Sequence, residues 1–179
     1  MAFTTTATRK SGGVANAYNI DWSVGLIGSN IREDVMLVQA LFRIFYYELM
    51  GFNDGMDPPP DEPAVIAVDG IIGPATRRHI KHFQGQMVAQ GYRVVQDGSC
   101  DPFRAQGQLS TVTHSTYTLE LLDIQCFNLC TKQGINNYDN LPNRDDMPAP
   151  LRAALKTRKK TARQYTYVAP QTVPTTGGA

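Results

Sequence analysis

The chain has 179 residues, enough for one domain with additional segments or for two very small domains. Its apolar fraction of 42% is typical of a globular fold and argues against wholesale disorder. Charge is unevenly distributed: residues 21–146 hold nine Lys and Arg against 16 Asp and Glu, whereas residues 147–179 hold six Lys and Arg and no acid. No stretch approaches the roughly 18–20 consecutive apolar residues of a membrane helix, so we expect no membrane partner.

The N-terminal residues 1–20 are rich in Thr, Ala and Gly, which predicts an extended arm. Arg9 and Lys10 are followed by no continuous apolar stretch, so this segment lacks the pattern of a secretory signal peptide. Asn30 is a good helix N-cap, and Glu33 three residues later completes a pair that resembles a capping box.

Three helices and a fourth, shorter one are predicted along the rest of the chain. The first extends to about Met50 and carries an apolar stripe formed by Val35, Val38, Phe42, Phe45 and Leu49. This stripe is so wide that we expect the helix to be covered on more than one side. The acidic, proline-rich stretch 53–63 predicts a loop. Further helices are expected at about 74–90, at about 116–133 before Gly134, and within the basic segment 150–163.

Cysteine and histidine residues show no metal-binding pattern. Cys100, Cys126 and Cys130 are too few for a disulfide framework, and the last two lie four residues apart on one helix face. We expect buried thiols there, because free cysteine behaves as a small apolar residue. His79 and His82 lack a third ligand nearby, so solvent-facing histidines are favoured over a zinc site.

Two helical segments and the turn between them carry a distinctive pattern. It consists of Asp34-Val35-x-x-Val38-Gln39-x-x-Phe42 followed by Val68-Asp69-Gly70-x-Ile72-Gly73-Pro74-x-Thr76-x-x-x-Ile80-x-x-Phe83-Gln84. The pattern resembles the peptidoglycan-binding domain found beside many cell-wall hydrolases. Ser23-Val24-Gly25 and Asp97-Gly98-Ser99-Cys100-Asp101-Pro102 extend the likeness to about residues 21–126. These additions look like a subgroup associated with phages and contractile injection systems.

Most motif positions also have a structural explanation that is independent of the family. Gly70 is expected to adopt a positive φ, and the Asp69 carboxylate to accept backbone N–H bonds within the turn. Gln39 and Gln84 are candidates for hydrogen bonds to loop backbone between the helices. The positions interpreted as mainly structural are Gln39, Asp69, Gly70, Ile72, Gly73, Pro74, Thr76, Phe83 and Gln84.

The resemblance implies a mainly α fold, a three-helix bundle with long loops and extended N- and C-terminal arms. The expected organisation is an arm at 1–20, a peptidoglycan-binding-like helical domain at 21–134, and a loop, short basic helix and arm at 135–179. The loop 53–63 is larger than the linker usual in the family. It is therefore a candidate to cover the groove in which a glycan or stem peptide would lie.

No catalytic constellation is evident, so we expect neither enzymatic activity nor a metal or other cofactor. His114 lacks the carboxylates and second histidine that a zinc amidase needs. Glu120 and Asp123 could pair as glycosidase carboxylates, but their spacing of three is equally typical of a solvated helix face. Cys126 is expected in the core, and nothing around Cys100 supports a nucleophile.

The C-terminal segment forms a basic tail composed of Arg152, Lys156, Arg158, Lys159, Lys160 and Arg163. Docking on an acidic neighbouring subunit is favoured over a solvated tail, and nucleic acid is the least favoured partner.

The resemblance and the missing signal peptide together suggest where the protein acts. Peptidoglycan lies outside the cytoplasmic membrane, so a wall-binding chain without a signal needs a carrier. We therefore expect a non-catalytic peptidoglycan-binding-like subunit of a phage virion, phage tail or contractile injection particle, assembled in the bacterial cytoplasm and fixed to other subunits by both terminal arms. The alternative is a purely structural assembly protein that reuses the fold without binding cell wall.

Overall fold

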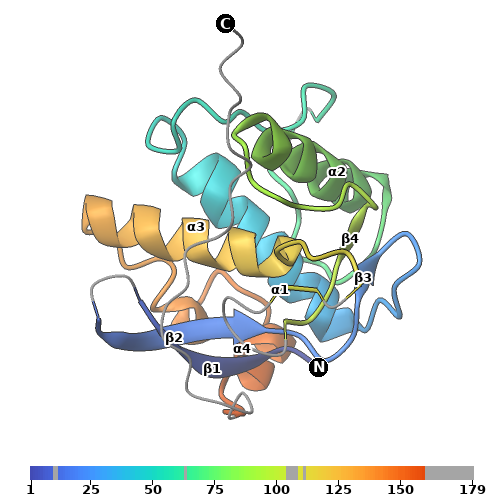
Figure 1. The fold of residues 1–179 in the computed structure, drawn as a ribbon. Helices are drawn as coiled ribbons and strands as arrows, with labels where there is room; N and C mark the ends of the chain where they lie inside the picture. Colours follow the sequence, from blue (N-terminus) through green and yellow to red (C-terminus); the bar gives the residue numbers. More distant parts are fainter. Residues whose placement is uncertain (10–11, 63, 104–108, 111, 160–179) are drawn as a thin grey trace, which may run out of the picture.

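The computed structural model describes residues 1–9, 12–62, 64–103, 109–110 and 112–159. Within these residues the chain forms four α-helices, one π-helix, one short 3-10 helix and two small antiparallel sheets (Figure 1). The elements are β1 (Phe3–Thr8), β2 (Val14–Asn19), β3 (Val24–Gly25), α1 (Arg32–Arg43), the π-helix η1 (Ile44–Glu48), α2 (Pro74–Ala89), β4 (Ser99–Cys100), α3 (Thr118–Gln133), the 3-10 helix η2 (Leu141–Asn143) and α4 (Ala149–Leu155).

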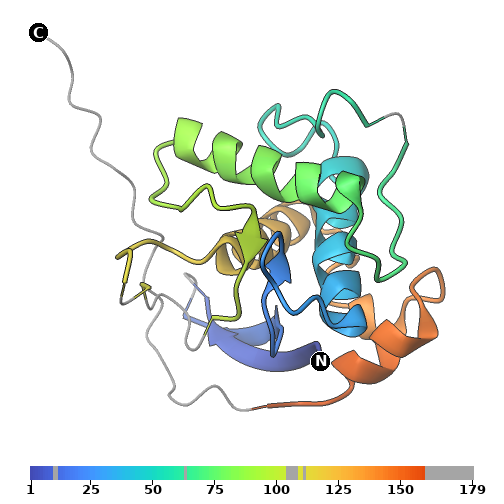
Figure 2. The ribbon, with the colours of Figure 1, turned by 90° about the vertical axis from the view of Figure 1, so that its right-hand side faces the viewer.

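The prediction of a mainly α three-helix bundle with extended arms is wrong, because the chain is about 39% helical and 12% strand and its two small sheets make the fold mixed α/β. Within the expected arm at 1–20, β1 and β2 pair as an antiparallel hairpin, whose register pairs Phe3 with Asn19 and Thr8 with Val14. Figures 1 and 2 show this hairpin at one end of the molecule and α2 at the other, with α1 and α3 between them. The β-branched threonines of β1 favour a pleated strand.

The hairpin belongs to the main core of the molecule. Ala2, Tyr18 and Ile20 are buried in the same apolar cluster as the helices, and α4 contributes Leu151 and Leu155 to it. Burial of these side chains stabilises the hairpin in place, since a two-stranded hairpin alone is marginal in water.

Helix α1 runs through the centre of the molecule and is covered on all sides, as the wide apolar stripe predicted. Every residue from Asp34 to Phe42 is buried. The expected continuation to about Met50 changes character, because residues 44–48 form the π-helix η1, closed by the hydrogen bond from the Leu49 N–H to the Ile44 carbonyl at 2.9 Å.

The prediction of a capping box before α1 is wrong. The N-cap is Ile31, and it makes no side-chain cap bond. Asn30 has a φ of 52°, and its side chain instead closes the preceding loop. It accepts the Gly25 N–H at 2.8 Å and donates to the Gly25 and Gly28 carbonyls. The loop therefore uses the side chain that would otherwise cap the helix.

The predicted helices at 74–90 and 116–133 are confirmed as α2 and α3, and Gly134 ends α3 with a φ of 66°. The expected helix within 150–163 is shorter, since α4 ends at Leu155. Residues 157–159 then run parallel to β1: the Thr4 N–H donates to the Thr157 carbonyl, and the Lys159 N–H donates to the Thr4 carbonyl. The remainder of the predicted arm, residues 160–179, lies outside the described residues.

Candidate functional site

The motif glutamine of α1 holds the first Asp-Gly turn. The Gln39 Oε1 accepts the backbone N–H groups of Asp69 and Gly70 at 3.1 and 2.9 Å. Its Nε2 lies 2.9 Å from Asp69 Oδ1, 3.1 Å from the Ile71 carbonyl and 3.1 Å from Thr76 Oγ1. One side chain thus links α1, the turn and the first turn of α2. We call this arrangement the first clamp.

The two glycines of the motif have different roles. Gly70 has a φ of 76°, as expected, and a Cβ there would lie 2.9 Å from the Arg32 carbonyl oxygen. Gly73 has an extended backbone with a φ of −89°, and nothing lies within 4 Å of its would-be Cβ. Pro74 begins α2, where its missing N–H costs nothing. Gly70 is therefore required by conformation and space, whereas Gly73 is not.

The apolar motif residues build the core. Phe83 is fully buried and packs edge-on against Phe42 and Phe45, with ring centroids 5.8 and 5.4 Å apart. Ile72 is half-buried and packs against the same apolar cluster. These side chains position the clamp and do not form a binding surface.

A second clamp repeats the same chemistry one helix later. The Gln84 Oε1 accepts the Gly98 N–H at 2.9 Å, and its Nε2 lies 3.0 Å from Asp97 Oδ1, the Ser99 carbonyl and Thr118 Oγ1. Asp97 also accepts the Ser99 N–H, just as Asp69 accepts that of Ile71 in the first turn. Sequence reasoning identified Gln84 but missed Thr118 as its partner. The signal was available, because a second Asp-Gly pair precedes a threonine at the start of a helix.

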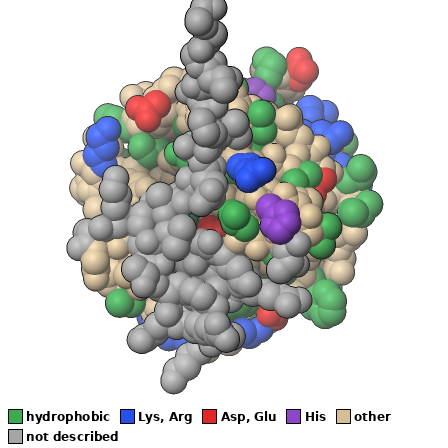
Figure 3. Space-filling model, in the orientation of Figure 1, with side chains coloured by type: hydrophobic (Ala, Val, Ile, Leu, Met, Phe, Trp, Pro, Cys, Tyr) green, Lys and Arg blue, Asp and Glu red, His purple; other side chains and the backbone are tan. Residues whose placement is uncertain are grey.

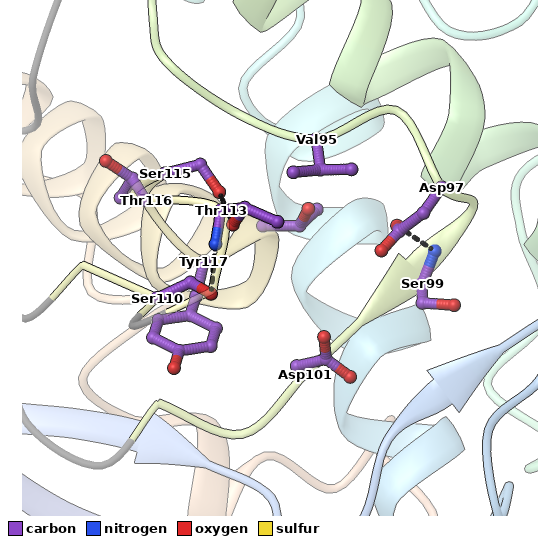
Figure 4. Close-up of a pocket in the computed structure, with 10 residues that line it drawn as sticks. Val95, Asp97, Ser99, Asp101, Ser110, Thr113, Ser115, Thr116 and Tyr117 are labelled. Atoms are coloured by element: carbon purple, nitrogen blue, oxygen red, sulfur yellow. Dashed lines mark hydrogen bonds between the residues drawn. The ribbon is translucent and has the colours of Figure 1, made fainter.

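A small pocket of about 80 Å³ lies beside the second clamp (Figure 4). Its lining comes from two segments that face each other, one after α2 and one before α3. The lining residues are Val95, Asp97, Ser99 and Asp101 from the first segment and Ser110, Thr113, Ser115, Thr116, Tyr117 and Thr118 from the second. Sequence reasoning did not predict this pocket, because the two segments meet only in the tertiary structure.

The second segment is held in a tight turn. The Ser110 N–H donates to the Ser115 carbonyl and the His114 N–H donates to the Ser110 carbonyl, both at 2.9 Å. His114 adopts a φ of 52°, which is uncommon for a residue with a side chain. The histidine considered for zinc chemistry is thus an exposed turn residue that does not line the pocket.

Carboxylates and hydroxyls line the pocket. Asp97 and Asp101 contribute two carboxylates, and no Lys, Arg or His is present among the described residues that line it. Asp101 accepts a hydrogen bond from Ser23 through one oxygen. Within the described chain, the buried hydroxyls of Ser99 and Thr116 have no hydrogen-bond partner.

His79 is fully buried, so its predicted exposure to solvent is wrong. Its Nδ1 lies 2.9 Å from the Ala75 carbonyl, which can only accept, so Nδ1 carries the proton. The Nε2 then accepts from the Tyr47 hydroxyl at 3.0 Å. Burial lowers the pKa of His79 below its ordinary value. The side chain lies between α2 and the π-helix because aromatic rings surround it there.

The acidic proline-rich loop packs on the outer side of α2. The Asp57 carbonyl lies 3.0 Å from both His82 Nε2 and Gln86 Nε2, and Glu62 forms an ion pair with Arg78. None of its described residues, 53–62, lines the pocket. Pro63, the last residue of the predicted loop, lies outside the described residues.

The carboxylates weighed as catalytic candidates are buried, so they do not form the solvated helix face that their spacing allowed. Glu120 and Asp123 are each 1% exposed. Asp123 Oδ2 lies 3.4 Å from Arg9 Nη1, while Oδ1 accepts from the Tyr138 hydroxyl and from the Tyr18 N–H. Burial raises the pKa of Asp123, and the Arg9 guanidinium opposes that rise. The ion pair of Arg9 and Asp123 joins the hairpin to α3. The sequence pattern of α3 alone could not predict this contact.

The three thiols are free and buried, as expected for Cys126 and Cys130. Burial raises the pKa of all three, so they stay protonated and are poor nucleophiles.

The described part of the basic tail binds partly to the chain itself. Arg152 pairs with Asp145 at 3.1 Å, and Lys159 pairs with Asp21 at 2.6 Å. Lys156 and Arg158 are exposed, whereas Lys160 and Arg163 lie outside the described residues. On the described surface visible in Figure 3, basic and acidic side chains are interspersed rather than gathered by sign.

No protein-family model, no curated protein and no solved structure matches the chain. In the described part of the chain, no helix is both long and apolar enough to cross a membrane. The same residues contain no group of three or more His, Cys, Asp and Glu side chains that could hold a metal ion.

Proposed function

We propose that this chain is a non-catalytic peptidoglycan-binding-type subunit of a phage or contractile injection particle. The observation that carries the proposal is the small polar pocket beside the second Asp-Gly turn, lined by carboxylates and hydroxyls, within the region of the motif resemblance. Wall polymers display many N–H, O–H and amine donors, and small polar pockets recognise such groups through convergent acceptors.

The position of the loop at 53–62 favours binding over a purely structural role. The loop at 53–62, the candidate to cover a ligand groove, packs instead against His82 and Gln86 of α2. It contributes nothing to the pocket lining.

The proposed absence of catalysis follows from where the reactive side chains lie. Asp123 is bound to Arg9 and Tyr138 in the core, and the Cys100 and Cys126 thiols are buried. The pocket carboxylates, Asp97 and Asp101, are placed as acceptors, and the first of them holds the turn.

A structural assembly role is the second candidate, and one observation favours it. Large apolar side chains are exposed in the loop before α1 and in the first Asp-Gly turn, with Ile27 88%, Ile71 66% and Leu26 56% exposed. Leu26 and Ile27 are neighbours in one loop, and exposed apolar side chains that lie together mark interaction sites.

Retention on purified sacculi tests the proposal. We expect the wild-type chain to co-sediment with sacculi in about 0.5 M salt, where charge attraction is screened. Replacing the exposed pocket residue Thr113 with Trp should fill the pocket and abolish retention, while Ile27→Ser should retain binding. Failure of the wild-type chain to co-sediment would overturn the proposal, and release of soluble muropeptides would contradict its non-catalytic part.

A further inference from the structure

We propose that His79, Tyr47 and the Ala64 carbonyl form a proton-operated latch, which fastens the segment after the acidic proline-rich loop more tightly at acid pH. The two side chains come from α2 and from the π-helix η1. Two polar contacts meet at one hydroxyl, because Tyr47 Oη lies 3.0 Å from His79 Nε2 and 3.4 Å from the Ala64 carbonyl oxygen. The latch is separate from the pocket and from wall binding.

The single proton of the Tyr47 hydroxyl serves one of these partners at a time. The Ala75 carbonyl accepts from His79 Nδ1 at 2.9 Å, so Nε2 of the neutral ring has no proton and accepts from Tyr47. The distance of 3.4 Å to the Ala64 carbonyl exceeds the about 2.5–3.0 Å of a well-formed O–H···O bond. While His79 is neutral, the hydroxyl proton is therefore directed at the ring.

Protonation of His79 reverses the direction of the first hydrogen bond. A proton taken up from solvent at Nε2 makes this nitrogen a donor, and the Tyr47 oxygen accepts from it. The Tyr47 O–H is then released and donates to the Ala64 carbonyl. Protonation of the ring thus creates a hydrogen bond to the backbone of a different segment.

Titratable groups face His79 from the loop, from η1 and from α2, whereas Phe42 of α1 packs against the ring and carries none. The two tyrosines remain neutral, because burial raises the pKa of both. The groups are Glu62 from the loop, Tyr46 and Tyr47 from η1, and Arg78 and His82 from α2.

The Glu62 carboxylate favours proton uptake by the folded chain. Burial lowers the pKa of His79, and the Ala75 carbonyl and Glu62 oppose that shift, whereas His82 and Arg78 add to it. The Glu62 side chain is only 8% exposed and forms an ion pair with Arg78. Glu62 is therefore a fixed counter-charge for the imidazolium, supplied by the loop that the latch holds.

The other anchors of the loop show which part of it the latch controls. His82 and Gln86 hold the Asp57 carbonyl, and Arg78 holds Glu62. Beyond Ala64, the Ile66 side chain is buried in the core. The Tyr47 hydrogen bond therefore acts between two fixed points, at the exposed backbone of Ala64.

Carbon-13 NMR of the Ala64 carbonyl tests the latch. We expect its signal to shift downfield as the pH falls from about 7 to about 4.5, with the same midpoint as the His79 ring. An Ala64 signal that stays constant while His79 titrates would overturn the proposal. A His79 ring that stays neutral until the chain unfolds would overturn it as well.

A tyrosine variant separates the hydrogen bond from the electric field of the charged ring. Tyr47→Phe removes the hydroxyl and keeps the aromatic ring, so His79 should still titrate while the Ala64 shift is lost. Tyr92→Phe, which removes a hydroxyl bound to Gln125, is the matched control and should retain the shift. An equal Ala64 shift in Tyr47→Phe would contradict the latch, because the field alone would then explain it.

A histidine variant identifies the group that takes up the proton. His82→Gln removes the neighbouring imidazole, and its amide can still donate to the Asp57 carbonyl. The Ala64 shift should persist in this variant with the midpoint of His79. Loss of the shift in His82→Gln, with His79 still titrating, would assign the response to His82 and overturn the proposal.

Discussion

At the scale of single residues, backbone geometry separates motif positions that look equivalent in the sequence. Gly70 combines a positive φ with a near contact to Arg32, whereas Gly73 has an ordinary extended backbone and open space around it. We expect Gly70→Ala to lower the free energy of unfolding by more than about 1 kcal/mol. Gly73→Ala should change it by less than about 0.5 kcal/mol. Urea unfolding of both variants tests this, and equal effects would contradict it.

The burial of His79 makes stability depend on pH. Its pKa is lowered in the folded protein relative to about 6.5 in the unfolded chain, so the unfolded state binds more protons between the two values. The free energy of unfolding should therefore be fully maintained above about pH 6.5 and decrease as the pH falls below it.

Urea unfolding at several pH values from about 7 to about 5 measures this slope. His79→Gln should reduce it, because the buried imidazole no longer takes up a proton on unfolding. His82→Gln, one turn away and partly exposed, is the control and should retain the slope. An unchanged slope in His79→Gln would contradict the assignment of this pH dependence to His79.

At the scale of elements, the buried ion pair between the hairpin and α3 holds the two together. Arg9 and Asp123 are 4% and 1% exposed, so removing one partner leaves an uncompensated buried charge. We expect Arg9→Met to lower the free energy of unfolding by about 3–5 kcal/mol.

The double variant Arg9→Met with Asp123→Leu is the informative comparison. It removes both charges together, so it should recover part of the stability lost in Arg9→Met. Chemical denaturation with both tyrosine fluorescence and circular dichroism measures the recovery. A double variant less stable than the sum of the two single changes would contradict a charge-based explanation.

At the scale of the whole molecule, the expected boundary at residue 21 divides a continuous core. The hairpin supplies Ala2, Tyr18 and Ile20, and α4 supplies Leu151 and Leu155 to the cluster that contains α1. A chain truncated to residues 21–134 should therefore lose cooperative unfolding and bind a hydrophobic dye, since it exposes this surface. If the truncated chain unfolded cooperatively with a near-native midpoint, residues 21–134 would be an independent domain, as the sequence predicted.

The parts of the fold that could be predicted are those held by interactions between residues close together in the sequence. Helices α2 and α3 follow from apolar spacing and from Pro74 and Gly134 at their ends. The capping box failed for a local reason, because the Asn30 side chain binds to Gly25 and Gly28 within the preceding loop.

The candidate site was predictable only in part. Gln84 and the second Asp-Gly turn were recognisable from the motif, and Gln84 indeed binds that turn. The pocket itself was not, because Asp101 and Ser110 are brought together by the packing of two irregular segments that have no periodic pattern.

The sequence by itself determined the local features: the helices at 74–89 and 118–133, the positive φ of Gly70, and the glutamines that hold the turns. These depend on hydrogen bonds and apolar spacing within short stretches or on a well-defined turn. The tertiary structure alone decided that residues 3–8 and 14–19 pair as a packed hairpin and that Arg9 contacts Asp123, 114 residues away. Such contacts form when segments that are distant in the sequence are buried against each other. No local sequence pattern identifies which residue will be the partner.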